Sequence, residues 1–157
     1  MNHLETHVQQ AKNICKQQGV RLTAIREKVL RLLLEIGRPV SAYDLLEQYK
    51  MSEKSGSQPM TIYRALSFLE SFSFIHKLES TRQYVACHHL DKSCHSEFTQ
   101  FLMCNHCGDV EEVPLTDALW KNIQKNAKKT HFKVEQPSLE IHGICNTCQT
   151  NTEDQQP

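Results

Sequence analysis

Residues 59–87, PMTIYRALSFLESFSFIHKLESTRQYVAC, contain one change of hydrophobic period, and that change decides the fold class. The first part carries an apolar stripe at helical spacing, formed by Ile62, Ala65, Leu66 and Leu69. The period then becomes two over 74–79 and 83–87, with 80–82 as the turn, which predicts a β-hairpin. A helix that leads directly into a hairpin is typical of a winged helix-turn-helix domain.

Three further helices are predicted upstream of this stretch. Residues 3–18 carry one apolar stripe and end at Gly19, a residue type that favours the left-handed conformation after a helix. The second helix stops before Gly37, and the third begins at 41–44, SAYD, which has the form of a capping box. Together with the hairpin, these helices predict a winged-helix domain over residues 1–86, which is a candidate DNA-binding domain.

The last helix of such a domain enters the major groove of DNA by its N-terminal end. The residues predicted to face outward there are Met60, Thr61, Tyr63 and Arg64. Arg64 offers bidentate donors to guanine or phosphate, and Arg82 at the hairpin tip is a candidate for a phosphate or minor-groove contact. A basic face on the second helix is a further candidate for phosphate contacts, formed by Arg21, Arg26, Lys28 and Arg31. Helix-plus-hairpin patterns also occur in enzymes, so the pattern alone leaves DNA binding open.

The charge of the 157-residue chain divides between its two halves. Lysine and arginine total 18, as do aspartate and glutamate, so the formal net charge is zero. Residues 1–86 hold an excess of about four positive charges, and residues 87–157 an equal negative excess. A neutral total argues against a histone-like binder. The sequence has neither an apolar run long enough for a membrane span nor an N-terminal secretory signal, so we expect a cytoplasmic protein.

The second half predicts a small α/β module over residues 98–148. Strands are expected over 98–103 and 110–113, a helix over 115–129 and a third strand over 132–144, which Pro137 interrupts. The buried stripe of the helix is expected to consist of Leu115, Leu119, Ile123 and Ala127. So small a module buries little core, which predicts a structural metal and a second copy of the chain as compensation. Residues 87–97 are predicted to form a hinge, and 149–157 a disordered tail.

Seven cysteines and nine histidines indicate metal binding rather than disulfides. Two CxxC pairs place Cys104, Cys107, Cys145 and Cys148 in one module. Four thiolates form a closed tetrahedral zinc site, and such a site is structural because no position stays open. The alternatives are a redox CxxC or buried cysteines without a metal. Two Cys and three His lie between 87 and 95, and His76 and Cys87 lie on the two strands of the hairpin, so a second zinc site with mixed ligands is plausible.

Seven motifs carry a resemblance to a known family. They are VRLTAIREKVLRLL (20–33), SAYDLL (41–46), MTIYRALSFL (60–69), FIHKLEST (74–81), YVACH (84–88), CNHCGDVEEV (104–113) and EIHGICNTC (140–148). In this arrangement the chain resembles the ferric uptake regulator (Fur) family, and within it the zinc uptake regulator branch. The expected fold class is therefore α+β, a winged helix-turn-helix domain followed by an α/β dimerisation domain with a four-cysteine zinc site.

The resemblance implies a homodimeric zinc-responsive repressor of zinc-uptake genes that binds double-stranded operator DNA. It implies no enzymatic activity and no small-molecule substrate. Tyr43 would join Tyr63 and Arg64 in contacting DNA. The four CxxC cysteines match the structural zinc ligands, and a second, regulatory zinc would bind His76, Cys87, His95 and Glu112. His89 and Cys94 are alternatives to His95. Residues 87–95 read CHHLDKSCH where iron-type members have HHDH, which favours zinc; an iron- or peroxide-responsive regulator is the alternative.

Overall fold

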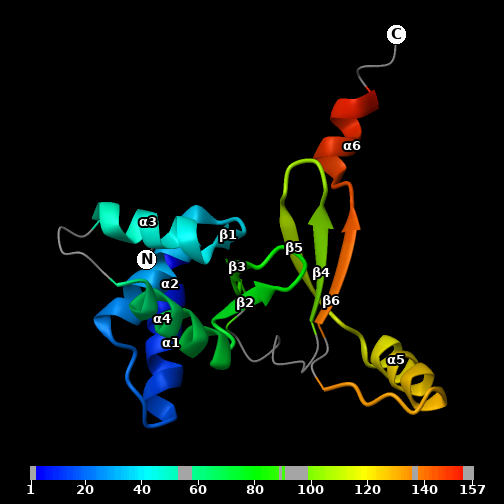
Figure 1. Ribbon diagram of the computed structural model, residues 1–157, viewed down its shortest axis with the longest axis horizontal. Coiled ribbons are helices and arrows are strands. Elements are labelled where there is room, and N and C mark those ends of the chain that lie inside the picture. The colour runs from blue at the N-terminus through cyan, green and yellow to red at the C-terminus, as the bar shows by residue number, and fades with distance from the viewer. Residues whose placement is uncertain (1–2, 53–57, 89, 91–98, 136–137, 154–157) are drawn as a thin grey trace. The chain divides into compact units, whose positions relative to one another are not determined.

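The computed structural model describes residues 3–52, 58–88, 90, 99–135 and 138–153 (Figure 1). The chain divides into two compact units, Met1–Leu90 and Asp91–Pro157. Each unit has its own three-stranded sheet, so each is described by itself. Within the described ranges, none of the helices is long and apolar enough to cross a membrane.

Unit 1 begins with four helices whose ends follow from the sequence. They are α1 (His3–Gln17), α2 (Ala24–Ile36), α3 (Ala42–Ser52) and α4 (Pro59–Ser71). As predicted, α1 and α2 are followed by glycines with positive φ, +70° at Gly19 and +62° at Gly37. The Gly37 N–H donates to the Leu33 carbonyl at 3.1 Å and closes the last turn of α2. A side chain at a left-handed position is strained, so glycine suits both ends.

The sheet of unit 1 contains the two predicted hairpin strands and a third strand that the sequence did not predict. Strands β2 (Ile75–Leu78) and β3 (Gln83–Ala86) pair antiparallel, and β1 (Val40–Ser41) adds to the other edge of β3. Two residues are too few to show a period. Ser41 also starts α3, because its hydroxyl accepts the Asp44 N–H at 3.1 Å and donates to the Asp44 carboxylate at 2.7 Å.

One hydrophobic core joins the helices of unit 1 to its sheet. Its fully buried large side chains include Leu30, Leu33, Leu45, Ile62, Leu66, Leu69, Phe74 and Ile75. The predicted stripe of α4 is buried here, which confirms the helical period read from the sequence. Consequently α4 is fixed in rotation, and Met60, Tyr63 and Arg64 are left exposed.

Unit 2 is a sheet with strand order β5-β4-β6. Strand β4 (Thr99–Cys104) lies in the middle, antiparallel to β5 (Val110–Pro114) and parallel to β6 (Ser138–Gly143). Parallel neighbours need a long crossover, and the segment that contains α5 (Asp117–Lys129) supplies it. Figure 1 shows the three strands side by side, with α6 (Asn146–Glu153) following directly after β6.

Two expectations for unit 2 are wrong within a single chain. The third strand begins at Ser138 and not at 132, because Pro137 lacks the N–H that a ladder requires, and 132–135 are irregular. No residue of α5 is buried, and Leu119 on its apolar stripe is 39% exposed. The apolar stripe of α5 is therefore not buried by the described residues of unit 2.

The predicted disordered tail over 149–157 is wrong at its beginning, because α6 continues to Glu153. The second CxxC turn, which we call the second knuckle, contains Cys145 and Cys148 and lies at the start of this helix; the first knuckle contains Cys104 and Cys107. Gln149 donates its backbone N–H to the Cys145 carbonyl at 3.0 Å and its side-chain Nε2 to the Ile144 carbonyl at 2.6 Å. Residues 154–157 lie outside the described residues.

Candidate metal centre and nucleic-acid interface

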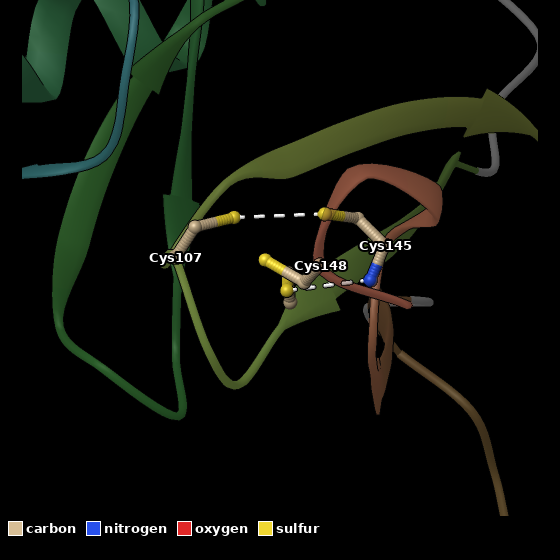
Figure 2. A group of neighbouring side chains, drawn as sticks. Cys107, Cys145 and Cys148 are labelled. Atoms are coloured by element: carbon tan, nitrogen blue, oxygen red, sulfur yellow. Dashed lines mark hydrogen bonds between the residues drawn. The ribbon is translucent and has the colours of Figure 1, made fainter. Parts of the chain in front are cut away.

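Four cysteines converge where the two knuckles of unit 2 meet. Cys104 ends β4, and Cys107 follows in the tight turn before β5. Cys145 is the residue before α6, and Cys148 lies in the first turn of that helix. The register of β4 with β6 pairs Cys104 with Gly143, so the second knuckle begins beside the first. All four sulfurs lie within 4.8 Å of one another. Figure 2 shows Cys107 and Cys145 pointing toward each other, with Cys148 beside them.

The sulfur spacing fits a tetrahedral zinc ion. The Sγ atoms of Cys107 and Cys145 are 3.7 Å apart. Zinc–sulfur bonds of about 2.3 Å place neighbouring sulfurs of a tetrahedron about 3.8 Å apart. A disulfide would need a separation of about 2.05 Å. The four residues therefore fit a closed four-thiolate zinc site, as the CxxC spacing predicted.

The electrostatics of the cluster call for a cation. Backbone N–H groups of Cys107 and Cys145 point at the Cys104 sulfur, the latter at 3.3 Å, and lower the pKa of that thiol to about 5. The hydrogen bond with Cys145 raises the pKa of Cys148 to about 12. At Cys107 the Asp109 N–H also lowers the pKa, but the hydrogen bonds with Cys104 and Cys145 and burial outweigh it and leave that pKa raised. The backbone N–H groups therefore do not hold all four cysteines as thiolates. A bound zinc ion would supply the positive charge that keeps the remaining thiols deprotonated.

Asn105, which the sequence did not single out, and His142, one of the further histidines considered as possible ligands, support this centre. The Asn105 N–H donates to the Gly143 carbonyl at 2.8 Å, and its side-chain oxygen lies 3.3 Å from His142 Nδ1. Both contacts tie the first knuckle to β6. Gly108 completes the turn at φ +73° and donates to the Cys104 carbonyl at 3.0 Å. The sequence shows an asparagine after the first cysteine of each CxxC pair. Only the register of β4 with β6 shows that Asn105 contacts Gly143 and His142.

A second pair of possible ligands lies on the hairpin of unit 1. His76 on β2 pairs with Val85 on β3. Cys87 follows two residues after Val85, so its side chain lies on the same face of the hairpin as that of His76. A ring nitrogen of His76 and the sulfur of Cys87 lie within 4.8 Å of each other, as the predicted cross-strand proximity requires. Cys87 is only 3% exposed and its N–H donates to the Phe74 carbonyl at 3.0 Å.

The other two residues predicted for the regulatory site belong to unit 2. Glu112 lies on β5, half-buried, opposite Phe101 of β4. His95 lies outside the described residues, as do the alternatives His89 and Cys94. The site as a whole therefore stays a prediction.

The residues predicted to contact DNA are exposed to different degrees in unit 1. Tyr43, in the first turn of α3, and Tyr63 and Arg64 on α4 are exposed, whereas Thr61 is half-buried. Arg82 is exposed in the hairpin turn, where it adopts φ +55°. The DNA-binding roles of these residues remain predictions.

The basic face of α2 is engaged within the chain. The Arg26 guanidinium stacks 3.5 Å from the centre of the Phe68 ring of α4 and donates to the Arg21 carbonyl at 3.2 Å. Arg31 pairs with Glu5 and Glu27, and the bond with Glu5 raises its pKa. These cations stabilise the packing of α2 against its neighbours, which the charge pattern alone did not predict.

Comparisons with known proteins agree on one family. The ferric uptake regulator family matches residues 17–142. The zinc uptake regulation protein of Escherichia coli K12 is 39% identical over 139 residues, which cover 88% of this chain and 79% of that protein. Among solved structures, a zinc uptake regulator complexed with zinc and DNA has a TM-score of 0.86 at 35% identity, covering 98% of this chain and 99% of the other. Holo XcZur has a TM-score of 0.80 at 37% identity, covering 92% and 98%.

Replacing one cysteine of the four-thiolate cluster tests its role. We expect Cys145→Ser to lose about one zinc ion per chain, because a hydroxyl is a poor substitute for a thiolate. Unit 2 should then unfold at a lower temperature, and Trp120 on α5 reports this by fluorescence. Cys15→Ala is the matched control, since Cys15 is buried in the core of unit 1. Unchanged zinc content and an unchanged Trp120 transition in Cys145→Ser would show that the cluster is not a zinc site.

Proposed function

Since this chain belongs to the ferric uptake regulator family, we propose that it is a zinc-responsive transcriptional repressor that binds operator DNA as a homodimer. The observation that carries this proposal is its likeness, over 98% of its length, to a zinc uptake regulator complexed with zinc and DNA. The regulated genes would be those for zinc uptake. Such a protein acts in the cytoplasm on DNA, not as an enzyme on a small-molecule substrate.

Each chain would bind one zinc in each of two sites. The four-thiolate site of Cys104, Cys107, Cys145 and Cys148 is structural, because it is closed and would stay filled. The regulatory site consists of His76, Cys87, His95 and Glu112, and its occupancy would follow the free zinc concentration. The proximity of His76 and Cys87 on the hairpin supports this second site. A sulfur ligand favours zinc over iron, which argues against the iron- or peroxide-responsive alternative.

A homodimer explains the exposed apolar stripe of α5. Leu119 is exposed and Ile123 and Ala127 are half-buried, so a second copy would remove apolar surface from water at this helix. Two copies also bring two recognition helices, which must be spaced to match half-sites one helical turn apart, or a multiple of it.

Zinc would act on DNA binding through this spacing. A regulatory zinc ligated by groups of both units restricts their relative orientation and therefore favours the dimer geometry that fits an operator. DNA must in turn tighten zinc binding by the same factor, because the two equilibria are linked.

Within each half-site, α4 would read the DNA. Arg64 contacts a guanine or a phosphate, and Thr61 and Tyr63 contact neighbouring groups of the same groove. Tyr43 on α3 and Arg82 in the hairpin turn add contacts on either side and fix the register of α4. The exposure of Arg64 and of both tyrosines supports these assignments.

Titrating DNA binding against buffered free zinc tests the switch. We expect wild-type protein to bind a selected operator duplex only when zinc is available. Cys87→Ala should need at least about tenfold more zinc, because even the loss of an outer-shell partner of a metal ligand typically lowers metal affinity by that factor. Cys15→Ala, which removes a core cysteine of the same unit, should follow the wild-type curve. Zinc-independent binding, or identical curves for both variants, would contradict the switch.

Iron(II) and manganese(II) in the same assay test metal selectivity, and a response to iron(II) alone would favour the alternative regulator.

A pair of substitutions at Arg64 tests the reading helix. Arg64→Ala should weaken binding to the selected duplex by about 1–3 kcal/mol and relax base preference at one position of each half-site. Arg64→Lys keeps the charge but not the planar fork, so it should preserve salt dependence while losing most of the base discrimination. Competition binding over a range of salt concentrations separates the two effects. Full operator affinity and unaltered base preference in both variants would remove Arg64 from the interface.

A further inference from the structure

Met60 is the most N-terminal exposed large side chain of α4. The helix begins at Pro59, and its core-facing stripe holds the opposite side of the cylinder against the rest of unit 1. Met60 is 61% exposed, and Arg64 lies four residues further on, exposed as well. Residues four apart on a helix lie above one another on one face. Met60 and Arg64 therefore form one row, with Met60 nearer the N-terminal end.

That end of a recognition helix enters the major groove. Among the groups that base edges present there, only the thymine C5-methyl is apolar. The thioether of Met60 has no hydrogen to donate and is a weak acceptor, so it cannot read the polar pattern of the groove. Its unbranched and flexible chain does suit contact with a methyl group. A single exposed methionine is ordinary on a protein surface, but this one lies on the DNA-facing row, one turn from a cation that attracts the phosphate backbone.

We infer that Met60 packs against the C5-methyl of a thymine in the operator, beside the group that Arg64 contacts, and so adds a thymine preference to each half-site. The inference rests on the proposed function, since it assigns a specificity-determining residue to the same DNA-reading face. It adds a second apolar contact to the interface, besides the ring of Tyr63, which can also lie on a thymine methyl. Tyr63 also lies on the exposed side of α4, and the experiment separates the two residues by testing Met60 directly.

Deoxyuridine substitution tests this contact, because deoxyuridine is thymidine without the C5-methyl. A duplex is first selected from a random pool with zinc-loaded wild-type protein, and each thymine is then replaced singly by deoxyuridine. At one thymine per half-site we expect wild-type affinity to fall about fourfold, the factor that burying one methylene-sized group gives. Met60→Ala should bind the unmodified duplex more weakly by a similar factor and be indifferent to deoxyuridine at that position. Met60→Leu should retain the sensitivity.

Met51→Ala is the matched control, because Met51 is 89% exposed near the end of α3 and lies outside the row that includes Arg64. It should reproduce the wild-type profile at every thymine. The inference is overturned if Met60→Ala shows the same deoxyuridine sensitivity as wild type at all positions, or if no position is sensitive in the wild type. If the zinc-loaded protein selects no duplex at all, the proposed function itself fails, and that result is visible before any deoxyuridine is introduced.

Discussion

Four thiolates held close together would repel one another, and unit 2 places its four cysteine sulfurs within 4.8 Å. Its two knuckles hold this arrangement at the ends of β4 and β6, where backbone N–H groups compensate one charge at Cys104. The rest of the unit offers little to oppose the repulsion. Among the described residues of unit 2, only Phe101, Met103, Cys104 and Leu115 are buried. A zinc ion bound by the four cysteines would therefore act as the centre of this unit, in the place that a larger apolar core would occupy.

Unit 1 has its own core, and within it the candidate ligands His76 and Cys87 lie close to α4. The chain leaves α4 through Ser73 at φ +55°, and the buried residue Phe74 then precedes β2. The Phe74 N–H donates to the Leu69 carbonyl at 2.9 Å, and the Phe74 carbonyl accepts the Cys87 N–H at 3.0 Å. One residue thus hydrogen-bonds both the helix that would read DNA and the cysteine proposed to bind regulatory zinc. This connection gives a physical route by which zinc at the hairpin would restrain α4.

The sequence predicted those features that local chemistry determines. The buried stripe of α4, the glycines after α1 and α2 and the two CxxC pairs follow from period, φ preference and ligand spacing. Features that depend on neighbours were missed. Strand β1 is too short to show a period, α6 is held by hydrogen bonds from its knuckle, and the cations of α2 bind partners that lie far away in sequence, such as Phe68. The stripe of α5 was recognised as apolar, but the described residues of unit 2 do not bury it. The regulatory ligand set rests on the family resemblance, and His95 in it lies outside the described residues.

The central claim is that one zinc holds unit 2 together while another controls DNA binding. The number of zinc ions per chain and the binding to operator DNA can be followed in one sample. Chelators of increasing strength are added, native mass spectrometry measures the bound zinc, and operator binding is recorded at each step. The account predicts that operator binding disappears when about one zinc per chain has left, while the four-thiolate zinc stays bound. Operator binding that persists after this first loss, or that ends only when all zinc has left and unit 2 unfolds, would contradict it.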